Sequence, residues 1–385
     1  ALNRYDGDHF GKVLWVKNYI GELNPDHDYY RNNATKNDGN IYLKVNYELV
    51  SGLSAYLDLQ YRHINYKING LSDKYNWTAA TPGMQKLDID EDFDFFNPKA
   101  GLSWQIDRNH RLYGSFSVAH KEPTRNNYTD GYFTEHPKAE RLFDYELGYT
   151  FANSWIHAGA NFYYMDYKDQ FVLTGELTNI GEAIAKNVGS SYRMGVELEA
   201  AWMPVDWFRW DANATWSKNR AKDWTITDND GDLCNLGDTP LSFSPDFIFN
   251  NIFTFSYQGF KAMVQSQYIS DQYLTNTGFK TMECKDANGN TTYETLLLKK
   301  HFNTNIDLSY NFSLPSVGIK SMNIGVSFYN IFSAKYDNNG WAAPQLVKSG
   351  NSVKAVNEWG VRDADAAGFA VSAPFNFMAH MSIDF

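Results

Sequence analysis

Apolar and polar side chains alternate along the last segment of the chain, up to the terminal residue, and this alternation strongly constrains the fold. Successive side chains of a β-strand point to opposite faces. One face of the segment consists of Phe375, Phe377, Ala379, Met381, Ile383 and Phe385, and the other of Asn376, Met378, His380, Ser382 and Asp384. A strand built in this way separates an apolar environment from a largely polar one.

The same period of two recurs along the chain. Clear examples are residues 41–49, 143–151, 192–202, 208–216 and 302–312. Strands of a soluble sandwich run for about five or six residues, whereas these runs last for about nine to thirteen, the length that a tilted strand needs to cross a bilayer. The pattern therefore predicts an all-β fold, a transmembrane antiparallel up-and-down β-barrel.

Composition agrees with a barrel that has a wet interior. Aromatic residues make up 16% of the chain, yet the mean hydropathy is −0.50. Lipid contacts only one face of each strand, so a barrel can be polar overall while Tyr and Trp lie at the membrane interfaces. The alternative is a soluble all-β protein with a Tyr-rich core, which the long and numerous alternating runs disfavour. The net charge of −11 argues against a nucleic-acid partner, because such binding needs clustered Lys and Arg.

Two kinds of connection alternate between the predicted strands. Short turns, such as residues 51–53, 107–109, 152–153 and 258–259, predict tight hairpins. Long connections cover residues 18–40, 68–91, 122–140, 172–187, 221–245, 274–299 and 335–371. Short turns at one rim and long loops at the other are typical of an outer-membrane barrel, with the long loops outside the cell. The pattern predicts about fourteen strands.

The first predicted strand differs from the others. Residues 1–10 have the pattern of the outer end of a strand, and no charged and apolar leader precedes them. We therefore expect residues 1–385 to be the carboxyl-terminal portion of a larger barrel. The rival interpretation is a self-contained passive porin or fatty-acid-type channel of about fourteen strands.

Five segments carry motifs in a recognisable order. They are HKEPTR at residues 120–125, RLFDYELGY at 141–149, NFYYMDYKDQ at 161–170, NVGSSYRMGVELE at 187–199 and VSFYNIFSAKY at 326–336. In these segments the chain resembles the TonB-dependent outer-membrane transporters, a family of receptors. The resemblance extends from about residue 100 to the end of the chain, with the motifs in the family's order.

The resemblance implies a barrel of about twenty-two strands, a separate amino-terminal plug, and energy supplied through a TonB box. It implies active import of a scarce nutrient, such as an iron chelate of the siderophore type, haem or cobalamin. The implied partners are the TonB motor complex acting through a plug outside this chain, the barrel-assembly machinery, which would recognise Phe385 as its terminal signal, and a surface lipoprotein over the loops. The barrel would also contact membrane lipid and lipopolysaccharide.

Ligand contacts are expected from aromatic side chains of the long loops, because rings can enclose a bulky solute. The candidates are Tyr29, Tyr30, Trp77, Tyr128, Tyr132, Phe133, Trp224, Tyr293, Trp341 and Trp359, each of which could equally pack a loop or an interfacial girdle. Four histidines expected near the outer rim lack the spacing of metal ligands; they are His9, His27, His120 and His136. No metal, cofactor or enzymatic activity is expected, because no nucleophile, histidine and carboxylate constellation is present.

The lumen-facing register of the strands leads to predictions about the barrel wall. Charged side chains are expected to line the wet interior and to pair across strands; they are Glu146, Glu197, Glu199, Arg193 and Arg209. Small residues on the same register are expected to let a plug or a neighbouring backbone approach closely; they are Gly148, Gly159 and Gly195.

The two cysteines, Cys234 and Cys284, both fall in predicted loops on the same side of the sheet. These loops are next but one in strand order, and an outer-membrane protein folds in an oxidising compartment. We therefore predict a disulfide between them. The alternative is a pair of unrelated thiols.

Overall fold

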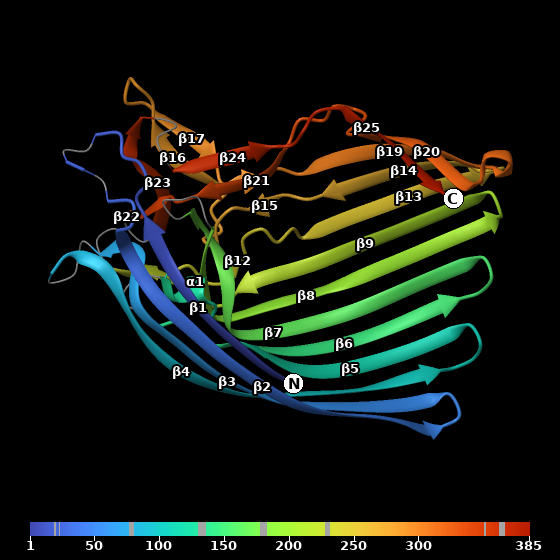
Figure 1. The fold of residues 1–385 in the computed structure, drawn as a ribbon, viewed down its shortest axis with the longest axis horizontal. Helices are drawn as coiled ribbons and strands as arrows, with labels where there is room; N and C mark the ends of the chain where they lie inside the picture. The colour runs from blue at the N-terminus through green and yellow to red at the C-terminus, as the bar shows by residue number, and fades with distance from the viewer. Residues whose placement is uncertain are drawn as a thin grey trace.

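The computed structural model describes residues 1–18, 21–22, 24–76, 81–129, 136–177, 183–227, 232–349, 352–361 and 366–385. In these residues one antiparallel sheet has the order β1-β2-β3-β4-β5-β6-β7-β8-β9-β13-β14-β19-β20-β25, fourteen strands to which β12 adds a fifteenth beside β9. The sheet curls around a hollow, with tight hairpins at the right in Figure 1 and longer connections at the left. We call these the hairpin end and the loop end. The predicted fold class is confirmed.

The strands of the sheet have the following bounds: β1 (Leu2–Lys12), β2 (Asp28–Val50), β3 (Leu53–Asn76), β4 (Gly83–Gln105), β5 (His110–Lys121), β6 (Glu140–Ala152), β7 (Ile156–Leu177), β8 (Ala183–Val205), β9 (Phe208–Ala221), β12 (Thr239–Pro240), β13 (Phe247–Tyr257), β14 (Phe260–Ile269), β19 (His301–Leu314), β20 (Ile319–Tyr329) and β25 (Asn376–Asp384). The turn between β13 and β14 is typical of the hairpin end. Gln258 and Gly259 there have φ angles of 47° and 84°. Two successive positive φ angles give a turn whose twist matches that of the flanking strands.

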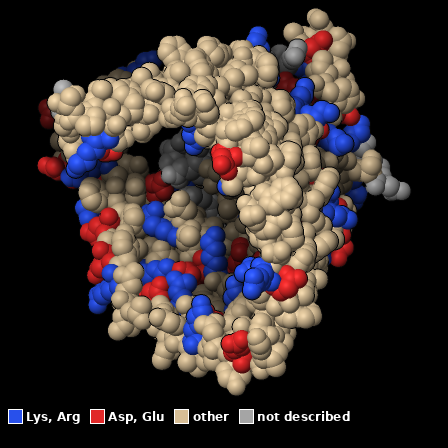
Figure 2. Space-filling view, turned by 90° about the vertical axis from the view of Figure 1, so that its right-hand side faces the viewer, with Lys and Arg blue, Asp and Glu red and all other residues tan. Residues whose placement is uncertain are grey.

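The two faces of the sheet differ as the alternation predicts. Large apolar side chains of the outer face are exposed, among them Ile41, Leu43, Phe96, Phe162 and Phe377. Figure 2, seen from the hairpin end, shows Lys, Arg, Asp and Glu side chains inside the hollow. An apolar outside around a charged inside suits a barrel surrounded by lipid.

Five strands are longer than the sequence predicted. β2, β3, β4, β7 and β8 have 23, 24, 23, 22 and 23 residues. They take up much of the predicted loops 18–40, 68–91 and 172–187, so the prediction of irregular loops there is wrong.

The outer face of these extensions explains the error. Beyond Tyr61, the outward side chains of β3 become polar and face acidic residues of β4. His63 Nδ1 lies 2.8 Å from Asp94 Oδ1, and Lys67 Nζ donates to Asp90 Oδ2 at 2.7 Å. Beyond the apolar belt the alternation continues with its faces exchanged: the outer face is polar, and the inner face carries buried apolar residues, among them Ile64, Ile68 and Ile89.

The connections after β14 and β20 fold together at the loop end, in a structure that we call the cap. Its strands are β15 (Gln272–Tyr273), β16 (Thr281–Lys285), β17 (Thr291–Thr295), β18 (Leu297–Leu298), β21 (Asp337–Ala342), β22 (Gln345–Ser349), β23 (Ser352–Val361) and β24 (Ala367–Val371). β16 pairs in parallel with β23, which joins the two connections in one sheet of order β17-β16-β23-β22. Leu274, Met282, Leu296 and Ala342 belong to its buried core.

The remaining elements are short. β10 (Thr225–Thr227) pairs with β11 (Leu233–Asn235), and η1 (Pro315–Val317) forms a turn at the hairpin end. α1 (Arg125–Thr129) follows β5 and contributes Tyr128 to a buried cluster with Ile64 and Ile68 of β3. Among the described residues, no helix is long and apolar enough to span a membrane.

Candidate functional site

The inner faces of β6, β7, β8 and β9 bring charged and polar side chains together. The register places Glu146 opposite Tyr163, Arg193 opposite Asn219, and Glu197 opposite both Asn161 and Thr215. Opposed residues of adjacent strands point to the same face. These side chains therefore share one stretch of the inner wall.

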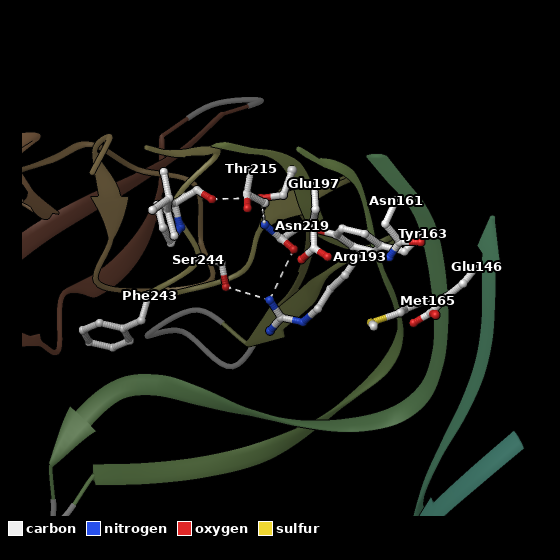
Figure 3. A pocket seen from close by; sticks show the side chains of 13 residues that line it. Glu146, Asn161, Tyr163, Met165, Arg193, Glu197, Thr215, Asn219, Phe243 and Ser244 are labelled. Atoms are coloured by element: carbon white, nitrogen blue, oxygen red, sulfur yellow. Dashed lines mark hydrogen bonds between the residues drawn. The ribbon is translucent and has the colours of Figure 1, made fainter. Parts of the chain in front are cut away.

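Figure 3 shows a pocket in this wall with a volume of about 320 Å³. Arg193 projects into it, and Nη1 donates to Ser244 Oγ at 2.9 Å and to Asn219 Oδ1 at 3.3 Å. The lining residues are Glu146, Asn161, Tyr163, Met165, Arg193, Glu197, Thr215, Ser217, Asn219, Phe243, Ser244, Pro245 and Ile248. One oriented cation, two carboxylates and several hydroxyl and amide groups can hold a polar solute or a polar peptide segment reversibly.

One side of the pocket comes from a connection, residues 241–245, rather than from a strand. The N–H of Phe243 donates to the Tyr273 carbonyl at 2.9 Å, and Ser217 Oγ donates to the Pro245 carbonyl at 2.9 Å. Phe243 has a φ angle of 51°, which is rare for a bulky residue. The connection is thus fastened both to the inner wall and to the segment that leads into the cap.

Of the two predicted wall charges nearer the hairpin end, Glu199 pairs across strands as the sequence predicted, and Arg209 does not. His157 Nε2 lies 2.9 Å from Glu199 Oε1 across β7 and β8. Arg209 Nη2 lies 2.6 Å from Asp211 Oδ1, on the same strand. The Arg209 pair therefore runs along β9, where the sequence predicted a pair across strands.

The three predicted glycines are not equivalent. An added Cβ would lie 2.1 Å from the Tyr113 ring at Gly148 and 2.7 Å from the Glu199 carboxylate at Gly159, so wall side chains already cover both positions. The prediction that these two admit a plug or a backbone is wrong. At Gly195 the neighbouring backbone does approach, because a carbonyl oxygen of β9 lies 2.3 Å from the added Cβ.

A second group of charges forms a network near the loop end. Arg62 Nη2 donates to Asp38 Oδ2 at 2.6 Å, and Arg62 Nη1 donates to Glu122 Oε2 at 3.0 Å. Lys36 also contacts Glu122. The side chains of Arg62, Asp38 and Glu122 are only 24%, 17% and 12% exposed, so the network ties the segment before α1 firmly to β2 and β3.

The predicted ligand-binding aromatics lie in separate places. Trp77, Tyr132 and Phe133 fall outside the described residues, as does the side chain of Trp359. Tyr293, on β17, is 64% exposed, and Trp341, on β21, is half-buried beside Gly368. Both belong to the cap.

The other described aromatics lie on or near the wall. Tyr29 and Tyr30, at the start of β2, meet edge to face at 5.0 Å. Tyr128 is buried 6.0 Å from Tyr66. Trp224 packs against a third cluster, which contains Val172, Val188, Ala221 and Leu241. The described aromatics do not form one cage, and a role in ligand binding remains a prediction for each of them.

The histidines do not gather either. His9 Nε2 lies 3.0 Å from the Tyr5 hydroxyl, and His120 stacks on Phe95 at 5.1 Å. His27 and His136 are exposed. In the described ranges no three His, Cys, Asp or Glu side chains are placed to hold a metal ion.

Cys234 and Cys284 are both buried, and no disulfide joins them, so the predicted bond is not formed. Cys284 lies in the core of the cap with Leu274 and Met282, whereas Cys234 lies on β11, in another connection. Separation in strand order could not reveal that the two loops fold into different packed units.

Sequence reasoning identified Glu146, Arg193 and Glu197 as wall residues, because they follow the inner register of long strands. It missed Ser244, which lies in a connection without periodicity. It also missed Asn161 and Tyr163, although their inner register on β7 was a usable signal.

A curled antiparallel sheet with an apolar outside and a charged, wet inside defines the class of outer-membrane β-barrels. The family model described as "TonB dependent receptor-like, beta-barrel" matches residues 3–350. The chain belongs to this family, whose members are outer-membrane receptors and transporters. No curated protein sequence matches it.

Solved structures share the fold at low sequence identity. The ferric yersiniabactin uptake receptor FyuA of Yersinia pestis has a TM-score of 0.63 and 15% identity, over 94% of this chain and 48% of that one. The ferric-catecholate import receptor Fiu of E. coli K12 has a TM-score of 0.63 and 14% identity, and the match covers 100% of this chain and 51% of that one. The siderophore receptor PiuA of Acinetobacter baumannii has a TM-score of 0.60 and 15% identity, and the match covers 91% of this chain and 44% of that one. The chain thus spans about half the length of these proteins.

Proposed function

We propose that this chain is the carboxyl-terminal part of an active importer that carries a scarce nutrient, of the ferric siderophore, haem or cobalamin type, across the outer membrane. The observation that supports the proposal most is the wet inner wall with its pocket around Arg193, in a barrel of the TonB-dependent receptor family. Three structural relatives are receptors for ferric chelates or siderophores. A polar path of this kind suits a solute that cannot dissolve in lipid.

The proposal includes parts beyond residues 1–385. A plug fills the lumen, further strands complete the barrel wall, and the TonB motor supplies energy through the plug. The barrel-assembly machinery recognises the strand that ends at Phe385, and the protein acts as a transporter rather than as an enzyme. The protein lies in a membrane of lipid and lipopolysaccharide, with its loop end outside the cell. A surface lipoprotein binds there, on the cap.

Uptake by cells tests the energised step. Cells that express the natural full-length protein should accumulate a radiolabelled ferric chelate against its gradient, and loss of the proton motive force or of TonB should abolish the accumulation. Uptake that continues unchanged without either would instead identify a passive porin or fatty-acid-type channel. A steady single-channel conductance in planar bilayers would support that alternative as well.

The orientation has its own test. Cysteines introduced at Asn288, in the cap, and at Ser316, at the hairpin end, occupy exposed positions. A membrane-impermeant maleimide added to intact cells should label the first and spare the second. The reverse labelling pattern would contradict the proposed orientation, and the two native thiols give little background because they are buried.

A further inference from the structure

Arg125, the first residue of α1, places its guanidinium beside the inner face of β2. Its Nη2 donates to Asn32 Oδ1 across 3.4 Å, a long hydrogen bond. Asn32 is buried, and its Nδ2 donates to the Leu71 carbonyl at 2.8 Å, which turns its oxygen toward Arg125. Tyr128 anchors α1 in the buried cluster, so the position of Arg125 is set by the fold.

Arg62 shows how the same wall neutralises an arginine. Its guanidinium bonds to the carboxylates of Asp38 and Glu122. In the described ranges Arg125 has no carboxylate partner, and its Nε is buried without a hydrogen-bond acceptor. A buried guanidinium N–H without an acceptor is unfavourable. An anion bound to Arg125 would remove this deficit.

Several side chains near Arg125 are neutral hydrogen-bonding groups. Tyr5 and His9 share the inner face of β1 and are hydrogen-bonded to each other. Burial, and next the charge of Arg125, lower the pKa of His9, so the imidazole is mainly neutral at pH 7. Burial, and next the negative charge of Asp73, raise the pKa of Tyr30, which stays a phenol. Neutral hydrogen-bonding groups therefore lie beside Arg125, and the other charges that act on Tyr30, those of Asp73 and Lys74, are paired with each other.

We propose that Arg125, together with Tyr5, His9 and Tyr30, binds an anionic oxygen group, a carboxylate or a phosphate, inside the loop end of the barrel. A guanidinium presents its N–H donors in a planar fork that matches two oxygens of such a group, and phenol hydroxyls add further donors. The inference rests on the proposed import function and deepens it, because the imported solute then carries at least one such group. An acidic side chain of a polypeptide segment that fills the lumen could supply the same chemistry.

Binding of simple anions tests the site in the natural full-length protein, purified in detergent. Citrate and inorganic phosphate are titrated by calorimetry into the natural protein and into the variants Arg125→Gln, Arg125→Lys and Arg111→Gln. Arg111 lies at the hairpin end, 5.6 Å from the centre of the Tyr113 ring, so its substitution controls for the loss of a positive charge from the lumen.

We expect Arg125→Gln to weaken citrate binding by about tenfold or more. Arg125→Lys should weaken it less, because Lys keeps the charge but loses the fork, and Arg111→Gln should stay within about twofold of the natural protein. Citrate binding that is unchanged in Arg125→Gln overturns the proposal. Arg125→Lys keeps the test informative if the Gln variant does not fold.

A different result is expected if an acidic side chain of the segment that fills the lumen occupies the site. The natural protein would then bind neither probe, and limited proteolysis would cut the lumen-filling segment faster in Arg125→Gln than in the natural protein or in Arg111→Gln. No binding together with unchanged proteolysis would refute the site. None of these measurements needs TonB or a proton motive force. A protein that binds citrate at Arg125 but fails the uptake assay therefore contradicts the import function and leaves the site intact.

Discussion

The inner wall of the barrel differs between two groups of strands. The inner faces of β2 to β8, which we call the charged half, carry the Arg62 network and the pocket around Arg193. The inner faces of β13, β14, β19 and β20, the amide half, carry mainly amides and hydroxyls, namely Asn250, Gln265, Gln267, Asn303, Asn305, Asn311, Asn323, Ser309, Ser321 and Ser327, with Lys261 and Asp307 as charged members. In Figure 2 the charges gather low in the hollow, and its upper part is mostly free of them.

The two halves satisfy their polar groups in different ways. Gln267 Nε2 donates to Asn250 Oδ1 at 2.8 Å, and Asn250 Nδ2 donates to Asn213 Oδ1 at 2.9 Å, where the amide half meets β9. Amides carry both donors and acceptors, so neighbouring amides satisfy one another. An opposite charge stabilises a buried charge best, as the two carboxylates do for Arg62, and Arg125 has no such partner in the described part of the wall. The charged half is therefore suited to binding, and the amide half to a smooth polar surface.

The largest effect should come from breaking the network of the charged half. Arg62→Ala leaves Glu122 and Asp38 with fewer partners in a poorly exposed site, which should lower the free energy of unfolding by about 2–3 kcal/mol. Urea titration of the protein folded into lipid vesicles measures the change. Arg111→Ala, at the exposed hairpin end, should change it little, and equal losses in both variants would contradict a special role of the network.

Gly195→Ala tests close packing within the charged half. The added Cβ would lie 2.3 Å from a backbone oxygen of β9, which neither strand can avoid without moving, and we expect a loss of about 1–3 kcal/mol. Gly189→Ala is a matched control on the same strand, because no atom lies within 4 Å of its added Cβ. The same urea titration compares the two variants, and similar stabilities would show that the wall relaxes around Gly195.

Asn250→Ala tests the amide half. It removes the side chain that links Asn213 to Gln267, and the lumen water that replaces it can satisfy both remaining amides. We expect a loss of only about 1 kcal/mol in the urea titration. A loss as large as that of Arg62→Ala would erase the distinction between the two halves.

The smallest effect should be a pH dependence that comes from His9. Its folded-state pKa lies below the ordinary value of about 6.5, so the unfolded chain takes up the proton first as the pH falls. The contribution of His9 is present above about pH 6.5 and is lost as the pH falls below that value. His9→Gln should therefore make stability less steep between pH 6.5 and 5 in vesicle unfolding, and an unchanged slope would contradict this role.

Much of the barrel wall could be predicted from the sequence. The inner faces of β6 and β8 followed from alternation, because a strand between lipid and water must have two unlike faces. The extensions of β2 to β4 toward the loop end were missed, since there the outer face is polar, as where Lys67 meets Asp90, and the apolar residues lie on the inner face. The cap was missed because β16 and β23 lie far apart in the chain, and their pairing carries no local signal.

The candidate site, too, could be predicted only in part from the sequence. The register placed Arg193 on the inner wall, but its partner Ser244 depends on where residues 241–245 fold. Arg125 lay in a motif of the resemblance, yet only the structure revealed that no carboxylate of the described residues pairs with it, whereas Arg62 has two. The expected bond between Cys234 and Cys284 failed for a similar reason, because spacing along the chain does not determine which loops pack together.

By itself, the sequence determined that this chain forms a lipid-facing sheet with a wet inside, because side-chain direction in a strand depends only on the parity of the residue number. It also determined the hairpins, whose turn residues act locally. The tertiary structure alone decided the joining of the two connections in the cap, the pocket around Arg193 and the lack of a carboxylate partner for Arg125 within the described ranges. Each of these depends on residues that are distant in the chain and meet only when the sheet curls.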